Sequence, residues 1–385
     1  MTAVNVDRVL PYLEAVRRLS PLIQQYRAVS DRERRIDPHV YEQLADAGLF
    51  RLWLPGPLGG PGLSPLEFLA VVEAVAALDG SVGWIVGNGG GMSRVGGYLP
   101  EVVARRWFED EKAFVASSTA AIGRAVPEDG GFRITGKWFF ASGAHHATWF
   151  MGLAACKNQD GSDGPVFCCY LPREEVTIHD TWHVSGLRGT GSCEFEANNA
   201  FVPSDHTHDF VAPSATQPGT VYRLPGISVF AWTVSVVPLG IARGAIDTFK
   251  EMATRKTRAG TTSVMCEREL IQSMVGRVET LHAAARALLV SAMTDLTDAA
   301  VVGGQILVQA RIGLRSAAAH AAETAVRIVD MMAAEAGAIA IFESCPLERA
   351  VRDLHAVAKH IAMSPNIYAT AGRVALGLDA GTARF

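Results

Sequence analysis

The spacing of apolar residues changes twice along this chain, and the two changes divide it into three parts. Over residues 1–112, apolar side chains recur at helical spacing, which predicts helices. Over residues 113–222, short alternating runs separated by Gly and Asp-Gly predict strands. Over residues 223–385, the helical spacing returns in segments rich in Ala, which pack closely in bundles. The pattern therefore predicts an α+β chain, mostly α, with three domains.

Two local signals refine this division. Ser64 stands before Pro65 and three positions before Glu67, which predicts a helix N-terminus there, and the helix should close at Gly80. Leu224–Ala242 is uncharged and about long enough to span a bilayer. It contains prolines and glycines, however, and charged helical patterns follow it, so we expect a buried helix and no membrane span.

Composition limits the classes of function. With 49% hydrophobic and 19% charged residues, the chain is globular. A net charge of -4 gives no electrostatic case for binding nucleic acid or an anionic membrane. None of the six cysteines forms a C-x-x-C pair, so we expect reduced thiols in the cytoplasm. The first residues lack the apolar region of a signal peptide.

A glycine-rich stretch, WHVSGLRGTGSCEFEANNAFVP, raises the question of a cofactor. A dinucleotide fingerprint needs a third glycine where this chain has Glu194, and it needs a helix where this chain has an alternating run. Two interpretations stay open. The stretch is either a plain connection between strands, or a turn that offers backbone amides and the hydroxyls of Thr190 and Ser192 to a cofactor.

Four segments together resemble the acyl-CoA dehydrogenase superfamily. They are LADAGLFRLWLPGPLGGPGLSPLEFLAVVEAVAALDGSVGW, GKWFFASGAHHATWF, GLRGTGSCEFEANNAFVP and PLERAVRDLHAVAKH. The resemblance covers nearly the whole chain. It implies an N-terminal helical domain, a central β domain, a C-terminal four-helix bundle, a flavin cofactor, and a homotetramer with flavin sites at subunit contacts.

The residues that would make the chain a true dehydrogenase are missing. In that branch a catalytic glutamate follows an Arg-Asp pair, which is Arg352-Asp353 in this chain. This chain has His360 and Ile361 where that glutamate would stand. An alternative base on the first bundle helix is also lacking, because only Asp247 lies nearby. Glu348 is a further candidate base, although it stands upstream of the pair.

The chain instead resembles the reduced-flavin branch, which includes two-component aromatic hydroxylases. That branch implies His360 and Ser142 as catalytic residues, with Ser142 near flavin N5 and His360 titrating near neutral pH as an acid or base. It also implies that the reduced flavin and oxygen form a C4a-hydroperoxide in a dry pocket. Trp84 and Trp182 would form flat walls for flavin and substrate.

Further flavin contacts are implied by the same resemblance. They are Arg188, Thr190 and Ser192 in the glycine-rich stretch, and Arg258 against the flavin phosphates, with Arg255 or Lys256 as substitutes. Asn88 is assigned to the pocket, with a turn as its ordinary alternative. Residues 334–344 are a weaker phosphate candidate.

Each assigned residue has a structural alternative. Ser142 would otherwise shape the turn before Gly143, the tryptophans would be core, and His360 would be an ordinary helix histidine. His355 is a rival to His360 on the same expected helix.

Histidines also allow a metal site to be considered. His206 and His208 are two apart, with Asp205 and Asp209 beside them, and such groups bind iron or zinc. No third histidine has a suitable spacing, so we expect a solvated loop and no metal. His145 and His146 would point to opposite faces of a strand.

The sequence thus predicts a cytoplasmic, homotetrameric monooxygenase that uses reduced FAD or FMN and molecular oxygen. No nicotinamide site is visible, so a separate NAD(P)H-flavin reductase would supply the flavin. The expected substrate is a small aromatic or heteroaromatic compound, such as a phenol or an indole. The alternatives are an acyl-CoA dehydrogenase with a non-standard base, and a flavin-free binding or scaffold protein.

Overall fold

The N-terminal part of the chain is helical. The computed structural model describes residues 4–158, 160–162, 164–257 and 263–382. Its first elements are α1 (Val6–Glu33), α2 (Pro38–Asp46), η1 (Gly56–Leu58), α3 (Pro65–Leu78), α4 (Gly80–Met92), η2 (Ser93–Gly97) and α5 (Glu101–Phe108). The Ser64 hydroxyl accepts from the Glu67 amide while the Glu67 carboxylate accepts from the Ser64 amide, so the predicted capping box of α3 is confirmed. Asp79 then ends α3 and caps α4.

The central part forms a mixed sheet, in which the described residues contribute seven strands. The strands are β1 (Val115–Glu128), β2 (Gly131–Ala141), β3 (Trp149–Cys156), β4 (Phe167–Pro172), β5 (Thr177–His179), β6 (Cys193–Pro203) and β7 (Thr207–Asp209). Their order is β5-β6-β2-β1-β3-β4-β7, with β1 and β3 parallel and the other neighbours antiparallel. The short 3-10 helices η3 (Arg173–Glu175), η4 (Arg188–Thr190) and η5 (Ser204–His206) lie in the connections.

The C-terminal part is a helical bundle. Its elements are η6 (Thr220–Arg223), α6 (Gly226–Ser235), α7 (Val237–Arg255), η7 (Met265–Glu267), α8 (Glu269–Val302), α9 (Gly304–Ala336), η8 (Gly337–Ile341), α10 (Pro346–Val357), η9 (Ile361–Met363) and α11 (Ile367–Ala375). Helices α7 to α10 pack against one another as the expected four-helix bundle. The long helices α8 and α9 each extend about 50 Å. Buried alanines of α9, such as Ala318 and Ala321, let the helices approach closely.

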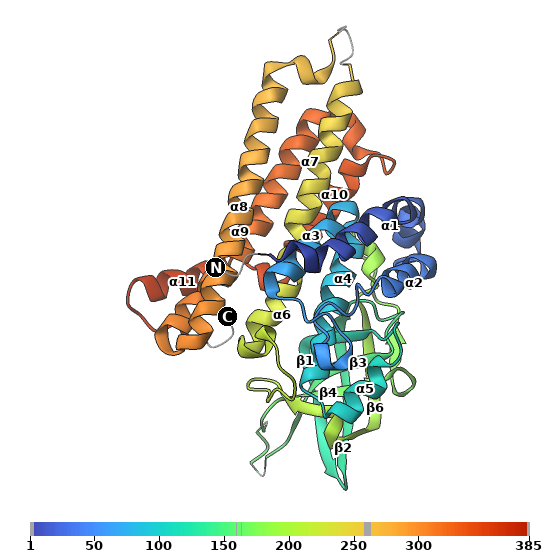
Figure 1. The fold of residues 1–385 in the computed structure, drawn as a ribbon, viewed down its shortest axis with the longest axis vertical. Helices are drawn as coiled ribbons and strands as arrows, with labels where there is room; N and C mark the ends of the chain where they lie inside the picture. The colour runs from blue at the N-terminus through green and yellow to red at the C-terminus, as the bar shows by residue number, and fades with distance from the viewer. Residues whose placement is uncertain (1–3, 159, 163, 258–262, 383–385) are drawn as a thin grey trace.

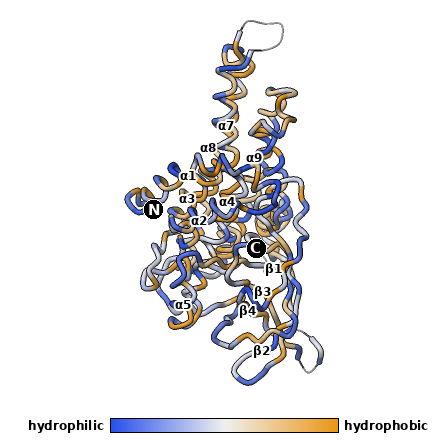
Figure 2. Tube along the Cα trace, turned by 90° about the vertical axis from the view of Figure 1, so that its right-hand side faces the viewer, coloured by the Kyte–Doolittle hydropathy of each residue, from blue (hydrophilic) through white to orange (hydrophobic). Residues whose placement is uncertain are grey.

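The three parts meet at α4. In Figure 1 the bundle stands above the sheet, and the N-terminal helices lie beside the junction. Helix α4 contacts β1 of the sheet, α6 and α7 of the last part, and the η4 turn. Hydrophobic and hydrophilic residues alternate along the helical tubes in Figure 2, so the helices can bury one face and expose another. Helix α4, which belongs to the N-terminal part, therefore also contacts the sheet and the C-terminal part.

The apolar stretch after residue 223 is buried, as expected. Among the described residues, one helical stretch, Gly226–Arg255, is long and apolar enough to cross a membrane. In this structure 83% of its most apolar window is buried inside the protein. The stretch divides into α6 and α7, and Pro238 lies in the first turn of α7, where its missing amide costs no helical hydrogen bond.

Candidate active site

A chain of hydrogen-bonded side chains joins α4, the end of β2 and the glycine-rich turn. Trp84 Nε1 on α4 donates to Ser142 Oγ at 3.0 Å. Ser142 Oγ lies 2.9 Å from Ser192 Oγ, which lies 2.7 Å from Thr190 Oγ1. All four residues are buried. We call Trp84, Ser142, Thr190 and Ser192 the hydroxyl cluster. The structure thus brings together four residues that the sequence predicted for the flavin pocket.

The backbone before Ser142 is strained, and this positions the serine. Phe140 adopts φ 65°, a left-handed conformation that bulky residues rarely take, and Gly143 has φ 78°. The Gly143 amide donates to the Thr190 carbonyl at 2.8 Å, which ties the end of β2 to the glycine-rich turn. Phe140 is left 64% exposed beside the buried hydroxyl cluster. A large apolar ring two residues before Ser142 is therefore exposed to solvent.

The glycine-rich turn leads into a strand, so it is not a dinucleotide fingerprint. Residue Leu187 has φ 53° and Gly191 has φ 53°, and β6 follows directly. The Leu187 carbonyl accepts from Thr190 Oγ1 at 2.9 Å and from Trp182 Nε1 at 3.1 Å. These bonds hold the turn in a fixed shape, in which the Thr190 hydroxyl contacts Ser192 and the Ser192 hydroxyl contacts Ser142.

His360 joins the cluster through its ring. Its imidazole meets the Trp84 indole edge-to-face, with 5.2 Å between the ring centroids. The residue follows α10, and its Nδ1 accepts from the Ala362 amide at 3.2 Å. A neutral ring in this position therefore has its proton on Nε2. Burial and the nearby Arg315 charge lower the pKa of His360 to about 4. The expectation that His360 titrates near neutral pH is therefore wrong, because the ring is desolvated.

Arg315 is a residue that sequence reasoning missed. It lies buried on α9, where its Nε donates to the Ala362 carbonyl at 3.1 Å and its Nη2 donates to the Ile361 carbonyl at 2.7 Å. These bonds fix the segment that follows His360. An arginine directly before the run of small residues in α9 was the available signal, since a cation on the buried face of a helix needs a partner.

Trp182 and Asn88 lie near the hydroxyl cluster but outside it. Trp182 is partly buried, and its ring meets Phe140 edge-to-face at 6.4 Å. Asn88 lies inside α4, where its Nδ2 donates to the Trp84 carbonyl at 2.8 Å. The turn alternative for Asn88 is therefore wrong, because the glycines around it are packed within a helix.

The basic residues assigned to the flavin are only partly described. Arg188 Nε donates to the Asp31 carbonyl at 3.1 Å, so this guanidinium is directed toward α1. Arg258 lies outside the described residues. Of its substitutes, Arg255 pairs with Glu251 at 2.8 Å and Lys256 donates to the Ala336 carbonyl at 2.5 Å. Residues 334–344 form the end of α9 and η8, and Ile341 is 76% exposed there.

The alternative acid-base residues are engaged elsewhere. Asp247 forms an ion pair with Arg243 at 2.7 Å, and Glu348 accepts from Arg352 Nε at 2.6 Å. His355 lies 2.9 Å from Asp330 on an exposed face, away from Trp84. None of these three side chains takes part in the hydroxyl cluster, whereas His360 contacts it directly.

The histidines considered for a metal are packed against aromatic rings. His206 stacks on Trp107 at 5.2 Å, and His208 Nε2 lies 2.8 Å from Tyr170 Oη. Burial lowers the pKa of His208 to about 4. The described residues contain no group of three or more His, Cys, Asp or Glu side chains that would hold a metal. The expectation of a solvated loop is wrong here, because both rings are partly buried.

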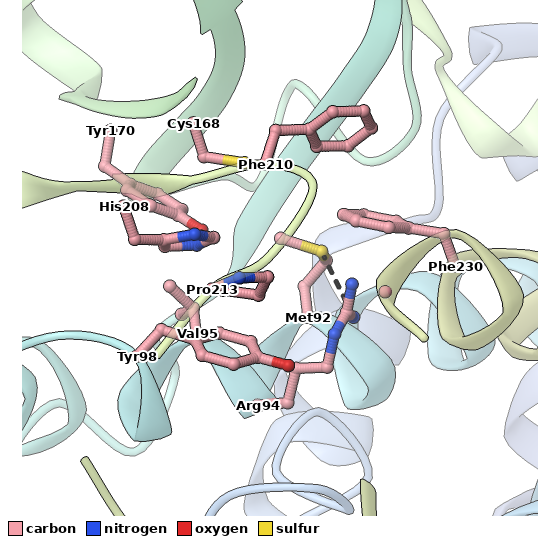
Figure 3. A pocket seen from close by; sticks show the side chains of 11 residues that line it. Met92, Arg94, Val95, Tyr98, Cys168, Tyr170, His208, Phe210, Pro213 and Phe230 are labelled. Carbon is pink, nitrogen blue, oxygen red and sulfur yellow. Dashed lines mark hydrogen bonds between the residues drawn. The ribbon is translucent and has the colours of Figure 1, made fainter. Parts of the chain in front are cut away.

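A separate pocket lies at the far end of α4 from Trp84. Figure 3 shows Arg94, Tyr98, Tyr170, His208 and Phe230 around it. Arg94 Cζ lies 4.1 Å from the Phe230 ring centroid, and its Nη1 donates to the Gly91 carbonyl at 2.8 Å. The empty space is about 320 Å³, which includes open solvent at the mouth. No member of the hydroxyl cluster lines this pocket, so the candidate active site lies elsewhere.

Comparison with known proteins identifies the family. The N-terminal domain of acyl-CoA dehydrogenases matches residues 14–107, and their C-terminal domain matches residues 232–365. The two matches together span more than half of the chain. The chain belongs to the acyl-CoA dehydrogenase family. Its architecture of helical domain, sheet and bundle is the fold of that family, as predicted.

The most similar relatives belong to one branch of the family. An indole-3-acetate monooxygenase of Pseudomonas putida is 29% identical over 350 residues, which are 90% of this chain and 89% of that protein. The flavin-dependent monooxygenase oxygenase subunit HsaA of Mycobacterium tuberculosis is 28% identical over 395 residues, 99% of each chain. The structure of XiaF from Streptomyces sp. with FADH2 and glycerol matches with a TM-score of 0.90 at 25% identity, over 99% of this chain and 98% of that one. The predicted branch is confirmed: within the family, the chain is a flavin-dependent monooxygenase.

Proposed function

We propose that the chain is the oxygenase component of a two-component system that uses reduced flavin and oxygen to hydroxylate or epoxidise a small aromatic or heteroaromatic compound. The observation on which this rests is the hydroxyl cluster with the His360 ring against Trp84. The cluster is buried and hydrogen-bonded, and it contains no carboxylate. A dehydrogenase would need a carboxylate base in this site, and neither the hydroxyl cluster nor His360 supplies one. The site therefore suits oxygenation better.

The residues around the cluster fit a flavin. An isoalloxazine ring has a polar edge of nitrogens and carbonyls and two flat apolar faces. The hydroxyl oxygens of Ser142, Thr190 and Ser192 would offer acceptor lone pairs to the polar edge, and the exposed Phe140 ring would offer an apolar face. When bound and reduced, the flavin supplies the electrons that activate oxygen.

The side chains of this protein would form hydrogen bonds to the flavin and the substrate, and they would exclude water. Ser142, which accepts from Trp84, is oriented by that bond and would hold the flavin N5 proton. The lowered pKa of His360 keeps its ring neutral at pH 7, and its Nδ1 accepts from the Ala362 amide, so its Nε2 proton would donate a hydrogen bond to an oxygen of the substrate. Buried apolar residues of α4, such as Ile85 and Val86, help to keep the junction dry.

The partners follow from the same assignment. The name "oxygenase subunit" of the relative HsaA supports a separate component, which we propose is an NAD(P)H-flavin reductase. The FADH2 bound to XiaF favours FAD over FMN for this chain. The aromatic substrate of the Pseudomonas putida relative supports a phenol- or indole-like substrate here.

We further propose that the chain forms a homotetramer in the cytoplasm. Apolar side chains are exposed on the bundle, including Val301 at 77%, Val302 at 67% and Phe342 at 58%. Exposed apolar residues of this kind are commonly covered by another subunit. The six cysteines are free thiols, which suits a reducing compartment.

The test is turnover with a supplied reductase. The purified chain is combined with NADH, FAD and an unrelated flavin reductase, and it is offered a panel of phenols and indoles under ¹⁸O₂. We expect one ¹⁸O atom in a ring-oxygenated product, seen by mass spectrometry. If an acyl-CoA bleaches the FAD-loaded chain and no panel member incorporates ¹⁸O, the dehydrogenase alternative replaces this proposal.

A further inference from the structure

Helix α10 holds the glycine-rich turn through two consecutive residues. Asp353 Oδ1 accepts from the Leu187 amide at 2.6 Å, and Arg352 Nη1 donates to the Ser185 carbonyl at 2.9 Å. The contact is very close, because a Cβ atom at Gly186 would lie 2.0 Å from the Arg352 carbonyl oxygen. The backbone of the turn therefore rests directly on the backbone of α10.

The hydrogen bond from Leu187 is made at a strained position. Leu187 has φ 53°, a left-handed conformation that is unfavourable at a residue with a bulky side chain. The Leu187 carbonyl in turn accepts from Thr190 Oγ1, which contacts Ser192. Without a partner for its amide, Leu187 would favour an ordinary conformation, and the Thr190 hydroxyl would lose its acceptor.

Arg349, also on α10, connects Asp353 to the helix that bears Trp84. Arg349 Nη2 lies 3.4 Å from Asp79 Oδ2, and its Nε lies 3.8 Å from Asp353 Oδ2. Asp79 caps α4 by accepting from the Val82 amide at 3.1 Å. Gly80 leaves room for this arrangement, because a Cβ there would lie 3.0 Å from Asp353 Oδ2. One arginine thus pairs with both carboxylates, one capping α4 and the other holding the turn.

These contacts close a circuit. Hydrogen bonds link Asp353 to Trp84 by way of Leu187, Thr190, Ser192 and Ser142. The ring of His360, at the end of α10, contacts Trp84 and so connects this chain of bonds back to the helix that bears Asp353. We propose that Asp353 is a positioning residue: by holding Leu187 in its left-handed conformation, it aligns the hydroxyls of the flavin site with the His360 ring. This inference rests on the proposed function, because it assumes that the hydroxyl cluster binds reduced flavin.

The charge of Asp353 is less important than its oxygen. Burial and the neighbouring Asp79 raise the pKa of Asp353 to about 7, against the lowering influence of Arg349, Arg352 and the Leu187 amide. A neutral group with the same shape therefore tests the role of the oxygen separately from the role of the charge. An asparagine retains an oxygen that accepts from the Leu187 amide, whereas leucine has the same size and accepts nothing.

The experiment compares Asp353→Asn and Asp353→Leu with the wild type. Asp330→Asn serves as a matched control, because Asp330 pairs with His355 on an exposed face of the same bundle. Hydrogen exchange at the amides of residues 183–195 is measured by mass spectrometry without flavin, and the Kd for reduced FAD is measured anaerobically. We expect Asp353→Leu to exchange faster in this segment and to bind reduced FAD roughly tenfold or more weakly. Asp353→Asn and Asp330→Asn should behave as the wild type.

The outcomes separate the inference from the proposed function. If Asp353→Leu keeps both the wild-type exchange and the wild-type Kd, or if Asp353→Asn loses as much as Asp353→Leu, the positioning role is overturned. If the wild type itself does not bind reduced FAD, the proposed function fails, and hydrogen exchange still decides whether Asp353 holds the turn. Should Asp353→Leu fail to fold, Asp353→Ser replaces it, because its short hydroxyl does not reach the Leu187 amide.

Discussion

At the scale of single residues, the protonation state of His360 determines what this site can do. The ring is partly buried and lies close to the Arg315 guanidinium, so the pKa of His360 falls to about 4. An imidazole with so low a pKa stays neutral at pH 7 and is a weak base there. The role expected of His360 is therefore that of a neutral hydrogen-bond donor, because its Nδ1 already accepts from the Ala362 amide and its Nε2 carries the proton.

The first prediction concerns His360 itself. His360→Ala should keep the fold and lower product formation by roughly a hundredfold, which is the usual loss when a positioned hydrogen-bond donor is removed from an active site. Oxygen consumption should continue and yield hydrogen peroxide, measured beside the product. His355→Ala is the matched control and should remain coupled. A His360→Ala variant that hydroxylates normally would show that the assigned role is wrong.

The second prediction concerns the charge of Arg315. In Arg315→Gln the pKa of His360 should rise, because the cation no longer opposes protonation, whereas Arg315→Lys should leave it low. NMR titration of the His360 ring measures both. In the wild type, the folded pKa of about 4 is below the ordinary value of 6.5. The stability contributed by neutral His360 is therefore present above pH 6.5 and lost as the pH falls toward 4. Equal titration of wild type and Arg315→Gln would contradict this account.

Sequence reasoning selected residues that the structure brings together, but it did not predict their protonation states. Ser142, Thr190, Ser192 and His360 were found because their segments resemble a known family. The sequence did not predict the lowered pKa of His360 or the hydrogen bonds from Arg315 to the segment after α10. Both arise because α9 packs against that segment and buries it. Desolvation is a property of the packed structure and not of local spacing.

At the scale of elements, strain is concentrated where β2 and the glycine-rich turn meet. Phe140 and Leu187 both have positive φ although neither is glycine. The glycines of the turn predicted a tight connection. Nothing in the sequence indicated that Phe140 and Leu187 would both adopt the left-handed backbone conformation. Their conformations are imposed by the Gly143 and Leu187 hydrogen bonds, which join segments distant in the chain.

The third prediction follows from the strain at Phe140. Phe140→Gly should raise the free energy of unfolding by up to about 1 kcal/mol, because glycine adopts positive φ freely. The same change should weaken flavin binding, since the exposed ring is removed. Phe139→Gly is the matched control: Phe139 lies in β2 without positive φ, so glycine there should destabilise the protein. Chemical denaturation and flavin titration measure both effects. Equal destabilisation by the two changes would show that Phe140 is not strained.

At the scale of the whole molecule, the site exists because three parts converge on α4. Helix α4 supplies Trp84, the sheet supplies Ser142 and the turn, and the bundle supplies His360. The periodicity of the sequence predicted each part, since helices and strands differ in the spacing of apolar residues. It did not predict how the parts contact one another, because the Asp79–Arg349–Asp353 bridge joins residues far apart in the chain.

The fourth prediction concerns assembly. If the exposed apolar residues of the bundle are covered by other subunits, light scattering should give the mass of a tetramer. The double variant Val301→Glu with Val302→Glu, at the tip of α8, should shift the protein toward smaller species. A wild type that is monomeric at micromolar concentration would contradict the proposed tetramer.

The most direct test of the central claim is the reaction of the reduced complex with oxygen. The protein is mixed anaerobically with one equivalent of reduced FAD, oxygen is added in a stopped-flow instrument with and without an aromatic substrate, and flavin absorbance is followed. We predict a transient species, neither reduced nor oxidised flavin, that outlives any seen in free solution and that is shortened in His360→Ala. Direct reoxidation without such a species, in the presence and absence of substrate, would contradict the assignment of this site to oxygenation.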